Sequence, residues 1–118
     1  MDTPPWVIVA DAAHARRVED AAGDLAEGLH IQAPVARAAP SPLVARALHD
    51  HELDEGSVEA AVGRELLEAI GDGAIRIAYV HASPLDPRLA RLCASRDARL
   101  LALEDEALGE RLAALLDD

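Results

Sequence analysis

The chain opens on an uninterrupted apolar run, Trp6–Ala10, which ends at Asp11. Consecutive apolar residues without alternation are typical of a strand buried on both faces, and so of a central strand in a covered sheet. Asp11 has a short side chain that can accept hydrogen bonds from nearby backbone N–H groups and begin a turn. The pattern therefore predicts an α/β protein with this strand inside its sheet.

The second half of the chain alternates helical and strand patterns. Ser57 is expected to cap one helix, and Asp86 followed by Pro87 has the N-cap and first-turn residues of another. The expected elements are a helix from Ser57 to about Ile70, ended by Gly71-Asp72-Gly73, a strand over Ile75–Val80, a helix from Pro87 to near Ser95, a strand over Arg99–Leu103 and a helix over about Asp105–Leu116. This order favours parallel strands joined by helical crossovers.

The first half allows two interpretations. Residues 12–29 can form one helix with an apolar face, which would be a plain Rossmann-like start. Gly23 and Gly28 oppose it, because each glycine weakens a helix by about 1 kcal/mol relative to alanine. The alternative is a β-meander with strands at 6–10, near 16–19 and near 29–35.

After a loop rich in alanine and proline over 33–42, Ser41-Pro42 is expected to start a short helix that reaches about His49. With the meander, the expected fold is a single α/β domain over 1–118. It would be a three-layer sandwich with a mixed sheet of about five strands, an N-terminal β-meander followed by βαβα.

Composition narrows the function classes. Hydrophobic residues make up 51% of the 118 residues but aromatics only 2%, so alanine, leucine, valine and isoleucine must build the core. The net charge of -11 disfavours broad binding to nucleic acids and anionic membranes. A single cysteine, Cys93, excludes an internal disulfide and is expected to be a buried small hydrophobe. With no signal peptide and no run of about 20 apolar residues, a cytoplasmic location is expected.

The segment Trp6–Arg16, read with the meander, resembles the opening strand of bacterial host-attachment proteins. These proteins are related to the central domain of archaeal and eukaryotic peptide-chain release factors. The strand, proline-containing turn and leucine–arginine helix over Ile75–Arg91 are also similar to the family. Glu104-Asp105-Glu106-Ala107-Leu108 stands where the family usually enters its last helix with a Lys-Asp-Leu type sequence.

The resemblance implies a fold more strongly than an activity, since function resides in sites. Release-factor relatives carry a glycine-rich loop with a glutamine that positions the water attacking peptidyl-tRNA. Here the one glutamine is Gln32 and the loop over 33–42 has no glycine. The resemblance therefore implies a non-catalytic binding module on a release-factor-like fold, associated with the ribosome or tRNA through a partner surface, and enzyme activity is not favoured.

Four polar residues follow the two best-defined strands, at the edge where open α/β sheets place ligands. Asp11 and His14 follow the first strand, and His81 and Ser83 follow the strand at 75–80. His81 could act as acid or base near neutral pH, and Ser83 as a nucleophile or phosphate contact. A turn-forming Asp11, a half-buried His81 and a turn serine beside Pro84 are the structural alternatives.

Two further groups could bind something. A locally basic stretch could dock an anion or an acidic partner, or pair with neighbouring carboxylates; it contains Arg88, Arg91, Arg96 and Arg99. His49 and His51 could bind a divalent metal if their segment is extended, because alternate side chains then share a face, but not on a helix.

No cofactor is expected, because the glycines match neither the Walker nor the dinucleotide fingerprint. The expected partner is a protein or ribonucleoprotein, and the sequence leaves a homo-oligomer open. The second hypothesis is a small Rossmann-like enzyme or ligand-binding domain with its site at Asp11, His81 and Ser83. A helix over 12–29 favours this second hypothesis, and a meander favours the first.

Overall fold

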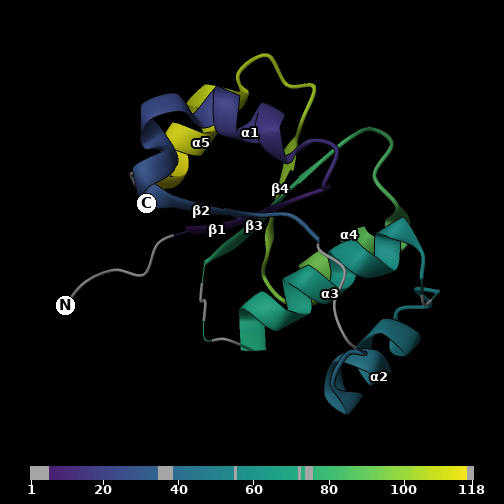
Figure 1. The fold of residues 1–118 in the computed structure, drawn as a ribbon. Coiled ribbons are helices and arrows are strands. Elements are labelled where there is room, and N and C mark those ends of the chain that lie inside the picture. The colour runs from purple at the N-terminus through teal and green to yellow at the C-terminus, as the bar shows by residue number, and fades with distance from the viewer. Residues whose placement is uncertain (1–5, 35–38, 55, 72, 74–75, 117–118) are drawn as a thin grey trace.

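Four parallel strands form one sheet in the order β2–β1–β3–β4 (Figure 1). The computed structural model describes residues 6–34, 39–54, 56–71, 73 and 76–116. The strands are β1 (Trp6–Ala10), β2 (Leu29–Gln32), β3 (Ile77–His81) and β4 (Arg99–Ala102). The helices are α1 (Ala15–Ala22), α2 (Pro42–Asp50), α3 (Val58–Gly71), α4 (Pro87–Ser95) and α5 (Leu108–Leu116). The predicted α/β class is confirmed.

The helices in the second half of the chain begin at the predicted N-cap residues. The Ser57 hydroxyl accepts the Ala60 N–H at 3.0 Å at the start of α3. The Asp86 carboxylate accepts the Arg88 N–H at 2.8 Å at the start of α4, with Pro87 as the first helical residue. Ser41 likewise accepts the Val44 N–H at 3.3 Å and begins α2. The expected ends at Asp72 and Ile75 lie outside the described residues.

The predicted β-meander is wrong. Residues 16–19 belong to α1, and a 3-10 helix, Gly23–Gly28, carries the chain on to β2. Val18 and Ala22, four residues apart, are buried at 0% and 3% exposure, which is the helical period facing the core. Gly23, with a φ of +53°, ends the α-helix, so the glycine cost shortens the helix but does not prevent it.

The predicted mixed sheet of about five strands is also corrected. The described sheet has four strands, and every neighbouring pair is parallel. The part of the expected third strand near 29–32 exists as β2, but it pairs parallel with β1 because the α1 segment crosses over between them. Val35 lies outside the described residues.

Alternate side chains of β1 enter two hydrophobic clusters. Val7 and Val9 pack in the cluster that includes α3 and α4 residues, whereas Trp6, Ile8 and Ala10 pack in the cluster that includes α1 and α5 residues. Figure 1 shows these helix pairs on opposite faces of the sheet, with α2 beyond α3. All five β1 residues are buried, as the apolar run predicted.

Trp6 joins the start of the first strand to the last helix. Its Nε1–H donates to the Leu115 carbonyl oxygen at 2.7 Å in a buried position. The Arg76 and Arg99 guanidinium carbons lie 5.1 and 5.6 Å from the Trp6 ring centroid, within cation–π range. Trp6 therefore covers the amino end of the sheet, and the one polar atom of its indole is hydrogen-bonded.

The strand order defines a switch point. The chain leaves β1 toward β2 on one side, and later returns through α3 to place β3 on the other side of β1. In such sheets the crevice outside the carboxyl ends of the two strands at the reversal is the usual ligand site. Here that crevice lies between the ends of β1 and β3.

Both faces of the sheet should contribute to stability. Leu66 on α3 and Leu112 on α5 are each 0% exposed, whereas Leu43 on α2 is 82% exposed. We expect Leu66→Ala and Leu112→Ala each to lower the free energy of unfolding by about 2–5 kcal/mol, because each leaves a cavity in one core cluster. Leu43→Ala is the matched control and should change it by less than about 0.5 kcal/mol. Urea unfolding measures all three; a small effect of either buried variant would contradict the two-faced core.

Candidate functional site

A small cavity of about 150 Å³ lies at the switch point, outside the carboxyl ends of β1 and β3. Its lining combines carboxylates, a phenol and apolar side chains from β3, α3, α4, the turn after β3 and the residue that follows β1: Asp11, Val58, Glu59, Val62, Tyr79, Ala82, Ser83, Pro84, Leu85, Asp86 and Leu89. Of the sequence-predicted cleft residues, the structure brings Asp11 and Ser83 together here.

Asp11 both turns the chain and lines the cavity. Its backbone carbonyl accepts the His14 and Ala15 N–H groups at 2.8 and 3.0 Å, which starts the turn into α1. Its carboxylate lies 3.5 Å from Nδ1 of His14, outside the cavity lining. His14 is therefore a neighbour of Asp11 that does not line the cavity. The Asp11 carboxylate is the charged group that faces the cavity.

Tyr79 is the central residue that sequence reasoning missed. It comes from β3, is 4% exposed and packs among apolar residues of the α3–α4 cluster. Burial, and secondarily the charge of the nearby Asp11 carboxylate, raise the pKa of the Tyr79 hydroxyl well above its ordinary value. The phenol therefore stays protonated, and it lines the same cavity as the Asp11 carboxylate.

Ser83 is held by Glu104 and not by a histidine. The Ser83 N–H donates to Glu104 Oε1 at 2.8 Å, and the hydroxyl donates to Oε2 at 3.4 Å. The Ser83 N–H is also the main reason why the pKa of Glu104 is lowered. His81 lies outside the cavity lining, with its ring centroid 5.9 Å from that of Tyr79 and its Nδ1 3.3 Å from the Ala82 carbonyl oxygen. Of these two predicted cleft residues, Ser83 lines the cavity and His81 does not.

The four predicted docking arginines do not form one site. Arg88 donates to both oxygens of Asp86, at 3.1 and 2.8 Å, and to the Glu52 carbonyl oxygen at 3.0 Å. Arg91 lies 3.9 Å from the Glu52 carboxylate. Arg99 lies over Trp6, and Arg96 borders a different cavity. Pairing with neighbouring groups, the structural alternative, describes Arg88 and Arg91.

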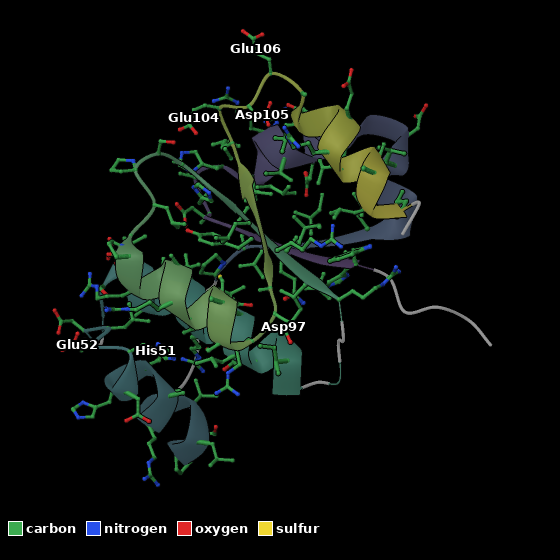
Figure 2. All side chains as sticks on the ribbon, turned by 180° about the vertical axis from the view of Figure 1, so that it is seen from behind. His51, Glu52, Asp97, Glu104, Asp105 and Glu106 are labelled. Atoms are coloured by element: carbon green, nitrogen blue, oxygen red, sulfur yellow. The ribbon has the colours of Figure 1, made fainter. Side chains whose placement is uncertain are left out.

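The metal hypothesis meets an unfavourable geometry. His49 lies in the last turn of α2 and His51 is its C-cap, so the segment is a helix end and not the extended strand that the hypothesis needs. Figure 2 shows His51 and Glu52 beside α2, far from the sheet. Among the described residues, no group of three or more histidine, cysteine, aspartate or glutamate side chains could hold a metal ion.

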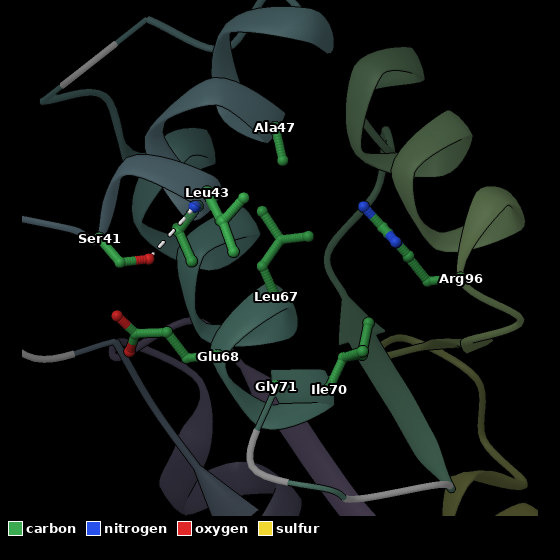
Figure 3. A pocket seen from close by; sticks show the side chains of 9 residues that line it. Ser41, Leu43, Ala47, Leu67, Glu68, Ile70, Gly71 and Arg96 are labelled. Atoms are coloured by element: carbon green, nitrogen blue, oxygen red, sulfur yellow. Dashed lines mark hydrogen bonds between the residues drawn. The ribbon is translucent and has the colours of Figure 1, made fainter.

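A larger cavity of about 750 Å³ lies beside α2 and α3 (Figure 3). Its lining is mainly apolar, with Leu43, Leu67 and Ile70 among the contributors. The polar groups at its border serve the fold: Ser41 caps α2, and Glu68 accepts from Arg64 at 2.7 Å. In Figure 3, Arg96 and Glu68 stand on opposite sides of the cavity. Polar groups do not converge here as they do at the switch point.

The comparisons with known proteins assign neither a family nor a function to the chain. No family model, no curated protein and no solved structure matches the chain. Within the described ranges, no helix is both long and apolar enough to span a bilayer. The host-attachment and release-factor resemblance, the cytoplasmic location and the expected partners stay predictions.

Cys93 should be inert in the folded protein. It is 0% exposed, as the sequence predicted, and burial raises the pKa of its thiol to about 11. We expect no reaction with a thiol reagent such as DTNB at about pH 8, and complete reaction once the chain is unfolded in guanidinium chloride. Rapid modification of the native protein would contradict this burial.

Asp86 should make stability depend on pH. Its pKa is lowered from the usual 3.8, mainly by the Arg88 side-chain hydrogen bond. Because the folded-state pKa is depressed, the contribution is present above the usual pKa and is lost as pH falls through the folded value. Asp86→Asn keeps a capping oxygen but loses the ion pair, and should cost up to about 1 kcal/mol at neutral pH.

The difference between wild type and Asp86→Asn should vanish at low pH, because the wild-type carboxyl is then protonated too. Asp86→Ala, which also removes the cap, should cost about 1 kcal/mol more than Asp86→Asn at every pH. Urea unfolding across the acid range measures all three proteins. An Asn penalty that is equal at neutral and low pH would show that the charge is not responsible.

Proposed function

We propose that this protein is a small-ligand-binding domain whose ligand places a positively charged nitrogen in the switch-point cavity. The observation that carries the proposal is the carboxylate-rich lining of that cavity at the carboxyl ends of β1 and β3. Asp11, Glu59 and Asp86 contribute to it, and no arginine does. We take the fold as three layers with helices over both sheet faces, which makes the strand ends the natural place for a ligand.

The three carboxylates differ in how far they remain available to accept hydrogen bonds from a ligand. Asp86 is already engaged with Arg88 through both of its oxygens. Asp11 lines the cavity together with Tyr79, and a carboxylate has about four acceptor positions, so Asp11 can accept donors from a ligand. Glu59 lies in the first turn of α3. Asp11 and Glu59 are therefore the groups that would bind the ligand's nitrogen.

The size and lining of the cavity favour a small organic cation. About 150 Å³ is below the roughly 300–1,000 Å³ of drug-sized ligand sites, so a headgroup fits and a nucleotide does not. Val58, Val62 and Leu89 offer apolar contacts for the carbons next to the nitrogen. A bare metal ion is disfavoured because the part of the chain that is described holds no cluster of three ligands. A primary ammonium or a guanidinium is the expected headgroup.

Binding is proposed in preference to catalysis because the only base that the described residues place at the Ser83 hydroxyl is Glu104, across a long 3.4 Å contact, and the lowered pKa of that carboxyl makes it a weak general base. The first hypothesis from the sequence, a module that binds a ribosomal or tRNA-bearing partner, was tied to the β-meander. The helical path of residues 15–28 gives that hypothesis less support than the switch-point alternative. Its partner surface stays a prediction.

We expect n-propylammonium and methylguanidinium to shift the backbone amide resonances near residues 11, 59 and 82–86 in a saturable way. The neutral 1-propanol, which has nearly the same shape as n-propylammonium, should bind at least about tenfold more weakly, because it cannot form charged hydrogen bonds. Titration of the ¹⁵N-labelled protein measures both. Equal binding of the alcohol, or no saturable shift with either cation, would refute the proposal.

A variant pair locates the charge that binds. Asp11→Asn should weaken binding of n-propylammonium about tenfold or more, since it neutralises an acceptor inside the cavity. Asp20→Asn changes the net charge by the same amount at an exposed position of α1 and should leave the affinity unchanged. Equal weakening in both variants would mean that overall charge, and not this cavity, attracts the cation.

A further inference from the structure

The larger cavity, of about 750 Å³, lies between the amino end of α2 and the last turns of α3 (Figure 3). Near its carboxyl end α2 packs closely on α3: a Cβ atom on Gly63 would lie 3.1 Å from Leu48 Cδ2 and 2.9 Å from Leu53 Cδ1. At the amino end of α2, by contrast, Leu43 is 82% exposed. The two helices therefore meet at one end of α2 and leave a space at the other.

The lining of this cavity is suited to an alkyl chain. Leu67 on α3 is buried and Leu43 on α2 is exposed, and both line the cavity. Val44, Ala47 and Ile70 are partly buried and complete an apolar surface that continues into the α3–α4 cluster. The volume falls within the roughly 300–1,000 Å³ of small-molecule sites. A contiguous apolar surface around a cavity of this size indicates a ligand site.

Arg96 contributes a positive charge at the border of this cavity. It is the C-cap of α4, and its side chain is exposed. Arg64, Arg88 and Arg111 each pair with a carboxylate. Among the described residues, no carboxylate lies within ion-pair distance of the Arg96 guanidinium. In a chain of net charge -11, an arginine without a carboxylate partner beside an apolar cavity is suited to binding an anionic group of a ligand.

The charges around the cavity determine how such a ligand would be oriented. Figure 3 shows Glu68 and Arg96 on opposite sides of the cavity. Glu68 accepts from Arg64 at 2.7 Å, and its carboxylate still repels an anion. The last turn of α3, which ends at Gly71, carries the negative end of the helix dipole. An anionic headgroup is therefore favoured at Arg96, with the chain of the ligand extending over the leucines of α2 and α3.

We propose that this cavity binds a small amphipathic anion, an alkyl carboxylate whose headgroup is held by Arg96 and whose chain covers the apolar lining. A guanidinium presents paired N–H donors that match the two oxygens of a carboxylate. Each methylene group that the cavity removes from water adds to the affinity. The site is separate from the switch-point cavity, which the first turns of α3 line through Val58, Glu59 and Val62.

Titration of the ¹⁵N-labelled protein with sodium octanoate, below the concentration at which it forms micelles, tests the proposal. We expect saturable shifts of the backbone amide resonances centred on residues 43–47, 67–71 and 96, and not on residues 11 and 82–86. 1-Octanol has the same chain without the charge and should bind at least about tenfold more weakly, because it cannot form the charged hydrogen bonds.

A first pair of variants tests the headgroup. Arg96→Gln should weaken octanoate binding about tenfold or more, since it removes the guanidinium that holds the carboxylate. Arg17→Gln changes the net charge by the same amount at an exposed position of α1, and it should bind octanoate like wild type.

A second pair of variants tests the place of the chain. Ala47 lines the cavity, so Ala47→Phe should fill part of it and weaken octanoate binding about tenfold or more. Ala45→Phe adds the same side chain at an exposed position of α2 outside the lining, and it should bind like wild type. Circular dichroism checks that both variants are folded, and the arginine pair remains decisive if Ala47→Phe is not.

Three results would overturn the proposal. No saturable shift with octanoate, or shifts centred elsewhere, would mean that the cavity is not the site. Equal binding of 1-octanol would mean that the cavity takes up apolar chains without using a charge. Equal weakening in Arg96→Gln and Arg17→Gln would mean that overall charge, and not Arg96, governs the affinity.

Discussion

The structure depends on burying β1 on both of its faces. A strand without a solvent-facing side needs helices above and below it and strands on either side, and the short chain supplies these with α3 and α4, α1 and α5, β2 and β3. Because its neighbours run parallel to it, every strand ends at the same edge of the sheet. Asp11, the residue that follows β1, therefore lies at the point where the strand order reverses.

The site follows from this placement. Tyr79 lies across the ladder from Val9, in the strand next to β1, and its buried hydroxyl needs a partner that an aliphatic core cannot supply. The Asp11 carboxylate lies near this hydroxyl, in the lining of the same cavity, at the end of β1. No described buried side-chain polar atom lacks a hydrogen-bond partner. Asp11 thus starts the turn into α1 with its backbone carbonyl and faces the cavity with its carboxylate, so one residue serves both the fold and the candidate site.

Interactions between residues close in sequence predicted the helix starts well, whereas contacts between residues far apart in sequence could not be predicted. Ser57 and the Asp86-Pro87 pair fixed helix starts because caps need only nearby residues. The glycine penalty does not exclude a helical path over residues 12–29, because α1 ends at Gly23 and a 3-10 helix carries the chain from there to Gly28. Asp11 and Ser83 were found from their positions after strands. Tyr79 and Glu104 were not, because their roles depend on how β3 pairs with β1 and β4.

Several charged side chains are segregated along the strand direction, with arginines at the amino ends and carboxylates at the carboxyl ends. Arg76 and Arg99 lie at the amino ends of β3 and β4, against Trp6, while Asp11, Asp86 and Glu104 lie at or beyond the carboxyl ends. In a parallel sheet such charges add up at each edge, whereas antiparallel strands would mix them. The acidic edge is where the proposed cation would bind.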